Sequence, residues 1–234
     1  MKTARSHKSR AFDLVHEDED VVVVDKAPGV LTVPTPKRER FTLVDEVSRH
    51  LSRSTRITKE AFVVHRLDRE TSGLVVFGKS ARARDRLGER WNDHERSYAA
   101  VVAGVVVDDE GTMSSRLVTD ARSLTRRSSG SDEGEEAITR FSVLARIDGA
   151  TLLSVVLQTG KRNQIRVHLK ERGHPILGDD RYGGLGRHRR WDDRRLGLHA
   201  QVLGFPHPRT GLPLRFDTGL PAVFRAFIEP ARRR

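Results

Sequence analysis

Short apolar runs rich in β-branched residues, separated by polar turns, predict a chain made mainly of strands. The first two runs flank the turn signal Ala27-Pro28-Gly29. The predicted strands lie at residues 21–24, 30–34, 61–64, 74–77, 98–104, 137–144, 152–157, 198–205 and 214–216. A very polar stretch lies between the third and fourth runs, so we expect a charged loop between two core strands.

Apolar residues at helical spacing interrupt this pattern and predict single helices over 42–53, 80–92, 222–228 and from Gln164 to the stop signals Gly173 and Pro175. Thr42 begins the first helix, and Ser80 is suited to cap the second. Residues 108–136 are polar, and we interpret them as a mobile excursion, not a domain boundary. We predict an α+β fold around a largely antiparallel sheet, with one domain over 13–230 and basic tails at 1–12 and 231–234.

The composition excludes several classes of protein. Of the 234 residues, 36% are hydrophobic and 32% are charged, which is enough apolar material for a core. The chain has no cysteine, so disulfide frameworks, thiolate nucleophiles and cysteine zinc sites are excluded. No apolar stretch reaches the roughly 18 residues of a spanning helix, and the N-terminus lacks the apolar part of a signal peptide. We therefore expect a soluble, cytoplasmic protein.

The charge of the chain favours a polyanionic partner. Lys and Arg number 43 against 32 Asp and Glu, which gives a formal net charge of +11. Besides the tails, an internal cluster interleaved with Tyr182 and Trp191 contains Arg181, Arg187, Arg189, Arg190, Arg194 and Arg195. Nucleic acid is the default partner of such a chain. The alternative is an arginine-rich composition in which arginine replaces lysine on solvated surfaces.

Asp68, in the polar loop between two predicted strands, is the best candidate for chemistry. Dinucleotide, P-loop, zinc-protease and nucleophile-elbow motifs are absent from the sequence. Of the ten histidines, the pairs His168/His174 and His199/His207 have poor metal-ligand spacing. We interpret these four as packing or RNA-facing residues and expect no metal. Arg66 and Arg69 lie beside Asp68 and favour its ionised form, which can act as a nucleophile or a base. The alternative interpretation is a capped, salt-bridged turn.

Residues 65–74, His-Arg-Leu-Asp-Arg-Glu-Thr-Ser-Gly-Leu, resemble the catalytic loop of the RluA-type pseudouridine synthases, in which the aspartate is the catalytic residue. Further segments resemble the family's other motifs, in the right order, at 24–30, 97–104, 159–169, 175–183, 198–200 and 205–208. The resemblance extends over about residues 13–230 and implies the pseudouridine synthase fold.

By this resemblance, Asp68 attacks the target uridine at ribose C1′ or at the base, so that the base detaches, turns and reattaches through C5. Tyr98 matches the tyrosine that stacks on the target base and assists proton removal, and Arg166 matches the arginine that pairs with the catalytic aspartate. Arg66 matches the residue associated with base flipping. We expect further RNA contacts from His65, Arg69, Lys161, Arg162, Asn163, Gln164, Arg189 and Arg190.

The sequence also departs from the family pattern. Asn163 stands where histidine is common and Lys161 where arginine is usual, so we expect changed RNA contacts there. An S4-type RNA-binding module is expected to be absent, which leaves substrate choice to the catalytic domain. The Arg181–Arg195 cluster and the excursion at 108–136 are the segments predicted to clamp the RNA.

Three functions are weighed. The first is an RNA pseudouridine synthase, a monomer that modifies ribosomal or transfer RNA and needs no cofactor, because an isomerisation consumes no redox equivalent or nucleotide. The second is a non-catalytic RNA-binding or RNA-chaperone protein on the same fold. The third, a carboxylate hydrolase or glycosidase, needs a second acid near Asp68. Glu70 is a poor candidate because it follows two residues later in a tight loop.

Overall fold

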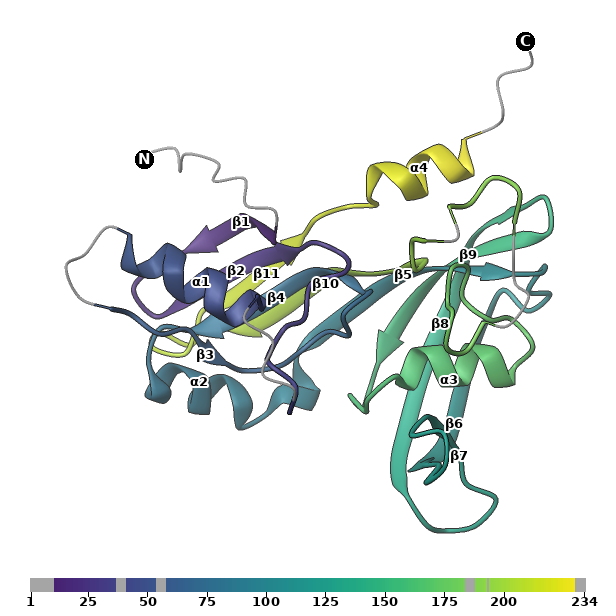
Figure 1. Ribbon diagram of the computed structural model, residues 1–234, viewed down its shortest axis with the longest axis horizontal. Helices are drawn as coiled ribbons and strands as arrows, with labels where there is room; N and C mark the ends of the chain where they lie inside the picture. Colours follow the sequence, from purple (N-terminus) through teal and green to yellow (C-terminus); the bar gives the residue numbers. More distant parts are fainter. Residues whose placement is uncertain (1–10, 37–40, 54–57, 184–187, 193, 230–234) are drawn as a thin grey trace. The chain divides into compact units, whose positions relative to one another are not determined.

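A computed structural model describes residues 11–36, 41–53, 58–183, 188–192 and 194–229, and the basic residues of both predicted tails lie outside these ranges. The chain divides into two compact units (Figure 1). The first unit contains residues 1–95 and 202–218, and the second contains 96–201 and 219–234. Strands with singly inserted helices confirm the predicted α+β class. Among the described residues, no helix is long and apolar enough to cross a membrane.

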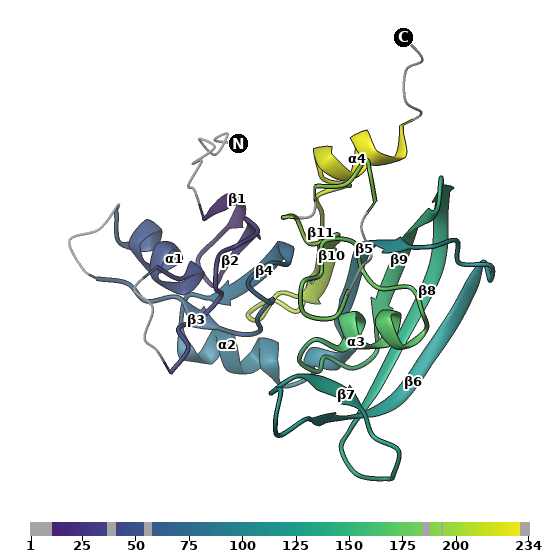
Figure 2. The ribbon, with the colours of Figure 1, turned by 45° about the vertical axis from the view of Figure 1, so that its right-hand side comes forward.

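The first unit is a small sheet with a helix on each face (Figures 1 and 2). Its strands follow the order β1-β2-β4-β10. β2 pairs antiparallel with β1 and β4, β3 pairs with β4, and β11 pairs with β10. The strands are β1 (Phe12–Glu17), β2 (Val21–Lys26), β3 (Phe62–Val63), β4 (Ser72–Gly78), β11 (Pro213–Asp217) and, from residue 202 on, β10 (Leu198–Pro206). The helices are α1 (Leu43–Ser52), α2 (Ala81–Gly88) and the short 3₁₀ helix η1 (Trp91–Asp93).

The core of this unit forms on both faces of β2 and β4. Val21 and Val23 pack with Leu74 and Val76 against Leu87 of α2. The intervening residues of both strands are buried on the opposite face. Burial on both faces explains why these runs are continuously apolar and do not alternate. The second predicted helix ends earlier than expected, at residue 88, and η1 follows it.

The segment after the first turn is not the strand that the sequence predicted over 30–34. It forms a single bridge, between Leu31 and Thr42, because its carbonyls are used elsewhere. The Leu31 carbonyl accepts from Leu43 N at 2.7 Å, and the Thr32 carbonyl accepts from Val44 N at 3.1 Å. These donors are two of the first-turn N–H groups that a helix leaves without an internal partner. The segment therefore caps α1 together with the side chain of Thr42.

The second unit is an antiparallel sheet in the order β5-β9-β8-β6-β7, with one helix against each face (Figure 2). The strands are β5 (Glu95–Ala103), β6 (Glu110–Thr119), β7 (Arg126–Ser128), β8 (Glu135–Ile147) and β9 (Ala150–Leu157). The helices are α3 (Gln164–Glu171) and α4 (Ala222–Ile228).

Two apolar clusters lie on the two faces of this sheet. Ile165 and Leu169 of α3 pack in one cluster with Leu153 of β9. Phe224 of α4 packs in the other with Leu152. Because adjacent strand residues point to opposite faces, these neighbouring leucines anchor one helix on each side.

The excursion predicted at 108–136 is largely ordered, so the expectation of a mobile segment is wrong for its strands. β6 pairs along its length with β8 and, at its end, with β7. Only Met113 and Leu117 of β6 are buried, and its other residues are half-buried or exposed. A strand with one exposed face carries many polar residues, which explains why the composition of this segment suggested a mobile loop. No boundary between the two units falls in this segment.

Candidate functional site

Asp68 lies in the first unit, in the loop between β3 and β4, as the sequence predicted. Its side chain is half-exposed, and its carbonyl accepts from Thr71 N at 3.2 Å, which closes a turn. The neighbouring Leu67 is buried, whereas Arg66 and Arg69 are exposed. The loop is thus held by the buried Leu67 and exposes its two arginines, and the Asp68 carboxylate lies between the buried and the exposed parts.

Thr32 fixes the backbone immediately before Asp68. Its hydroxyl donates to the Leu67 carbonyl at 2.8 Å and accepts from Leu67 N at 3.2 Å. Thr32 is buried, so both bonds are shielded from water. One side chain therefore satisfies both backbone groups of the residue next to the carboxylate.

Lys26 fixes the backbone immediately after Asp68. Its side chain is fully buried, and its Nζ donates to the carbonyls of Arg69 at 2.9 Å, Val30 at 2.8 Å and Ala27 at 2.9 Å. Three carbonyl acceptors match the three donors of an ammonium group. The loop carrying Asp68 is thus held at the residue on each side. Neither Lys26 nor Thr32 was singled out from the sequence, in which they read as ordinary members of a strand and its sequel.

His65 is occupied inside the first unit. Its ring stacks on Trp91 with 4.3 Å between ring centroids, and its Nε2 lies 3.1 Å from Val76 N. A ring nitrogen that accepts from a backbone amide carries no proton. His65 therefore ties the start of the loop to β4.

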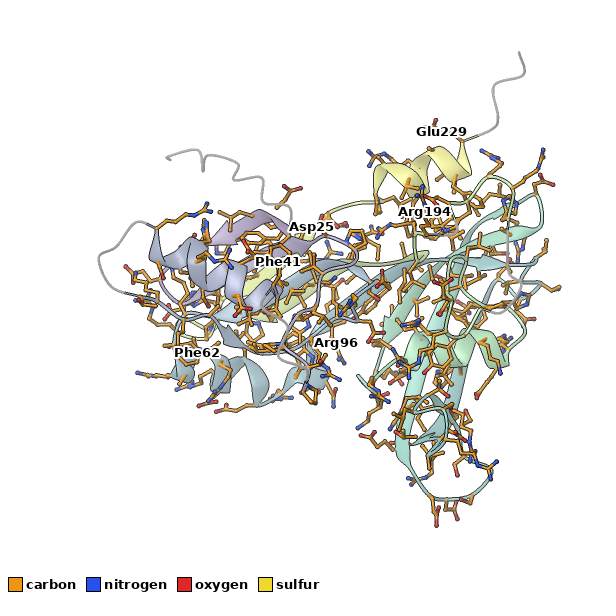
Figure 3. The ribbon with its side chains drawn as sticks, viewed as in Figure 1. Asp25, Phe41, Phe62, Arg96, Arg194 and Glu229 are labelled. Atoms are coloured by element: carbon orange, nitrogen blue, oxygen red, sulfur yellow. The ribbon has the colours of Figure 1, made fainter. Side chains whose placement is uncertain are left out.

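Tyr98 lies in the second unit on β5, opposite Val155, and is half-buried against the cluster under α3. Arg96, two residues earlier on the same strand face, is buried, and burial lowers the pKa of its guanidinium (Figure 3). A Cβ built on Gly160 would lie 2.7 Å from Arg96 Nη1, so a larger residue at this position would require the Arg96 side chain to move. The sequence analysis missed Arg96; its place two residues before Tyr98 is the signal that could have found it.

Arg166 forms a buried ion pair with Asp179. Its Nε and Nη2 each donate to one carboxylate oxygen at 2.7 Å, a bidentate geometry, and the two side chains are 9% and 0% exposed. The guanidinium also lies over the ring of Tyr182, 5.1 Å from its centroid. Asp179 further accepts from Arg181 N and Tyr182 N. Asp179, which the sequence analysis did not select, therefore orients Arg166 through the strongest kind of hydrogen-bonded pair.

The segment before α3 contains both inward and outward residues. Gln164 is buried: its Oε1 accepts from Thr159 Oγ1 and Lys161 N, and its Nε2 donates to residues of β8. Asn163 is also buried, at a φ of 57°, and its Oδ1 accepts from Tyr182 Oη at 3.3 Å. Lys161 is half-exposed beside Glu135, and Arg162 is exposed. The side chains of Gln164 and Asn163 thus hold the backbone of this segment through internal hydrogen bonds.

His168 on α3 is buried and uses both ring nitrogens inside the unit, with Thr139 Oγ1 at 2.9 Å and Ser115 Oγ at 3.0 Å. Burial lowers the pKa of this imidazole. Of the two roles considered for it, packing and RNA contact, the geometry matches packing.

The arginines predicted to form a cluster at 181–195 make different kinds of contact. Arg189 is exposed and pairs with Asp148 at 2.7 Å. Arg190 donates to the carbonyls of Ala226 and Glu229 at the end of α4, so it holds that helix in place. Arg187 lies outside the described residues.

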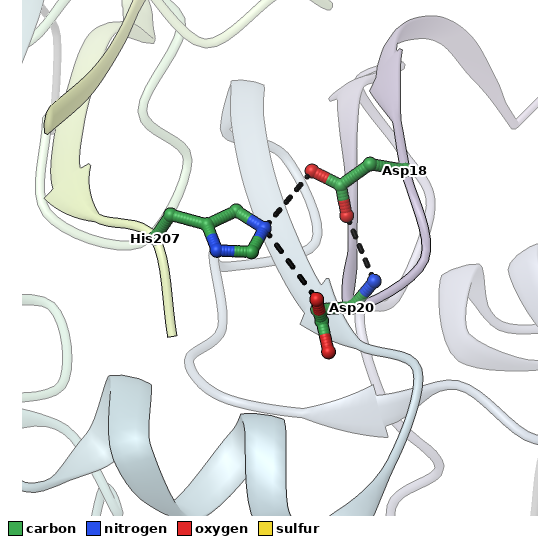
Figure 4. Close-up of side chains that lie close together, drawn as sticks. All are labelled: Asp18, Asp20 and His207. Carbon is green, nitrogen blue, oxygen red and sulfur yellow. Dashed lines mark hydrogen bonds and ion pairs between the residues drawn. The ribbon is translucent and has the colours of Figure 1, made fainter. Parts of the chain in front are cut away.

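Asp18, Asp20 and His207 lie within ligand distance of one another in the first unit (Figure 4). The imidazole Nδ1 lies 3.2 Å from both Arg209 N and Thr210 N, so it is an acceptor and Nε2 carries the proton. Nε2 faces Asp18 at 3.3 Å and Asp20 at 3.6 Å, and Arg209 pairs with Asp20 at 2.8 Å. The imidazole thus turns a protonated nitrogen toward the two carboxylates, which does not match the unprotonated nitrogen that a metal needs.

Comparison with known sequences gives consistent matches. The profile of the family described as RNA pseudouridylate synthase matches residues 20–171. The uncharacterised RNA pseudouridine synthase YlyB of Bacillus subtilis is 36% identical over 95% of this chain and 73% of its own length. The ribosomal large subunit pseudouridine synthase D of Xylella fastidiosa is 35% identical over 90% of this chain and 66% of its own length.

Solved structures show the same fold. The human RNA pseudouridylate synthase domain containing 1 matches with a TM-score of 0.76 at 22% identity, over 96% of this chain and 91% of that one. The human RNA pseudouridylate synthase domain containing 4 matches with a TM-score of 0.75 at 22% identity, over 91% and 90%. These matches confirm the fold predicted from the motifs.

Proposed function

Because the chain belongs to the RNA pseudouridylate synthase family and is an RNA pseudouridine synthase, we propose that Asp68 is its catalytic nucleophile. The observation that carries this assignment is the double anchoring of its loop by Thr32 and Lys26. Buried contacts that fix the backbone on both sides of a half-exposed carboxylate are what preorganised chemistry requires. A merely structural turn at a loop surface does not need them.

The reaction is an isomerisation of uridine. The N1–C1′ glycosidic bond breaks, a C5–C1′ bond forms, C5 loses its proton and N1 gains one. Asp68 attacks ribose C1′ or the base, and both routes have this same overall balance. The family membership favours this enzyme over the non-catalytic RNA-binding protein and the hydrolase considered from the sequence.

We assign Tyr98 to stacking on the target base and to assisting removal of its C5 proton, since an aromatic face is a favourable surface for an extruded base. We assign Arg166 to the catalytic machinery because its motif matches that of the family's catalytic-site arginine. Asp179 orients Arg166, and Lys26 and Thr32 orient the loop of Asp68. These three act through other residues and are positioning residues.

The exposed cations are the proposed RNA contacts. They are Arg66, Arg69, Arg162 and Arg189, together with the half-exposed Lys161, which precedes Arg162 in the chain. Phosphates bind such side chains without regard to base identity, so these contacts set affinity and salt dependence. We assign His65, Asn163, Gln164 and Arg190 to holding the surrounding backbone, because their described contacts are internal.

We propose large-subunit ribosomal RNA as the first substrate to test, with transfer RNA as the alternative. The proposal follows the printed names of relatives such as the synthase D proteins, which are longer than this chain. We expect the enzyme to act in the cytoplasm and as a monomer.

Mapping of pseudouridine tests the substrate. Unmodified transcripts of large-subunit ribosomal RNA and of transfer RNAs are incubated with the protein and read by carbodiimide adduct formation and primer extension. We expect new stops at discrete uridines of the ribosomal transcript. Stops confined to transfer RNA would replace the proposed substrate, and no stop in either would contradict both.

A further inference from the structure

The loop Asp120–Thr125, which joins β6 to β7 in the second unit, holds an exposed leucine in a strained conformation. Leu124 has a φ of 54°, in the left-handed region that non-glycine residues with branched side chains rarely adopt. Its side chain is 63% exposed, so burial does not offset the strain. Strain of this kind persists only where the surroundings fix it, and it concentrates at functional sites.

Several hydrogen bonds fix the backbone of this loop. Asp120 Oδ1 accepts from Ser123 N at 2.8 Å, Ser123 Oγ at 2.9 Å and Arg122 N at 3.1 Å. Leu124 N donates to the Asp120 carbonyl at 2.9 Å, and Asp120 N donates to the Thr125 carbonyl at 2.8 Å. The loop is therefore rigid by its own contacts.

Two arginines from the segments that resemble family motifs fix the backbone of Leu124. Its carbonyl accepts from Arg162 Nη2 at 3.1 Å and from Arg181 Nη2 at 2.7 Å. Arg162 precedes α3, and Arg181 follows the Asp179 that orients Arg166. Leu124 is thus fixed by the same segments that hold a residue assigned to catalysis.

The surroundings of Leu124 are cationic. Arg122, Arg127, Arg162 and Arg181 are exposed, and Asp120 is the only acid in residues 120–127. An apolar side chain among exposed guanidinium groups suits a partner that offers both phosphates and the flat apolar face of a base. RNA is that partner for an enzyme of this family.

We propose that Leu124 is an RNA wedge: it contacts or unstacks a base of the substrate while the four surrounding arginines bind phosphates. Apolar wedges that displace bases are a known device of nucleic-acid recognition. The backbone of Leu124 is already fixed, so little conformational entropy is lost on binding. The proposal rests on the proposed function only in requiring an RNA substrate.

The test compares Leu124→Asn with Leu212→Asn. Asparagine accepts the left-handed conformation, so Leu124→Asn removes the apolar group without adding strain. Leu212 is 65% exposed in a hairpin of the first unit, which makes its substitution a matched control. The dissociation constants and kcat/KM are measured with unmodified transcripts of large-subunit ribosomal RNA and transfer RNA. We expect Leu124→Asn to weaken binding about tenfold on the scale of one lost base contact, and Leu212→Asn to match wild type.

The salt dependence of binding separates the wedge from the arginines. Leu124→Asn should leave the slope of log K against log salt unchanged, because it removes no charge. Arg122→Gln and Arg127→Gln should each lower the slope by about 0.7 to 0.9. Circular dichroism checks folding, and Leu124→Gly, which also adopts positive φ readily, repeats the test if the asparagine variant fails to fold.

Wild-type affinity and turnover in both Leu124 variants would overturn the wedge while leaving the enzyme's activity established. A wild-type protein that isomerises no uridine in either transcript would instead contradict the proposed function. The binding comparison still decides the wedge in that case.

Discussion

The buried pair of Arg166 and Asp179 gives the sharpest test of how the second unit holds a residue assigned to catalysis. Asp179→Asn removes the negative charge but keeps the shape of the side chain. An amide oxygen can still accept from Arg181 N and Tyr182 N, which now bond to Oδ1. The substitution thus isolates the charge of the pair from its role in the turn.

Burial sets the size of the expected effect. The two side chains are 9% and 0% exposed, and both N–O distances are 2.7 Å. Removing one partner of a buried pair leaves a charge without compensation and costs about 3 to 5 kcal/mol of unfolding free energy. The asparagine keeps an oxygen toward Arg166 Nη2 but turns an NH₂ donor toward Arg166 Nε. We therefore expect a loss within that range of about 3 to 5 kcal/mol.

Urea denaturation measures the loss, and Asp148→Asn provides the control. The pair of Arg189 and Asp148 has the same 2.7 Å distance, but its side chains are 79% and 59% exposed. Solvent screens such a pair, so the control should show no resolvable change. We also expect kcat of Asp179→Asn to fall by at least about tenfold with little change in KM, because Arg166 loses its orientation. Equal stabilities of the two variants would refute the reasoning.

Three further predictions concern other parts of the molecule. Thr32→Val should lower kcat and should lower the unfolding free energy by about 1 to 3 kcal/mol, because the backbone groups of Leu67 are left without a partner. Thr32→Ser should keep both near the wild-type values. Urea denaturation and turnover assays check this, and an unimpaired valine variant would contradict it. The pKa of His168 is lowered from 6.5 by burial, so the unfolded chain binds a proton more readily, and stability from this group should be full above about pH 7 and decline as pH falls below 6.5. His168→Gln should flatten the pH dependence of unfolding free energy between about pH 5 and 7, and an unchanged slope would contradict the assignment. Tyr98→Phe should keep RNA affinity but reduce turnover, while Tyr98→Ala should lose both; equal effects of the two on turnover and affinity would count against separate roles.

Regular elements with a strong pattern were predictable from the sequence. The run at 21–24 and the helix begun by Thr42 form as expected, because burial on two faces and a capping side chain are local signals. The structure of segment 30–34 was not predictable, because its carbonyls bond to a helix that follows it in the chain. Strand β6 was not predictable either, because a strand with one exposed face carries as many polar residues as a loop does.

The candidate site shows the same division. Asp68 and Tyr98 stood out through their motifs and neighbours. Lys26, Thr32 and Asp179 did not, because their roles depend on partners that lie close only after folding. The partner for Arg166 that the structure shows in its own unit is Asp179, which lies 13 residues further along the chain.

Tritium release from RNA labelled at uridine C5 tests the central claim most directly. The C5 proton leaves only when the glycosidic carbon takes its place, so release reports the isomerisation itself. The account predicts release by the wild-type protein and none by Asp68→Ala, with RNA binding retained in the variant. Release by Asp68→Ala at a measurable rate would contradict the assignment of Asp68 as the nucleophile.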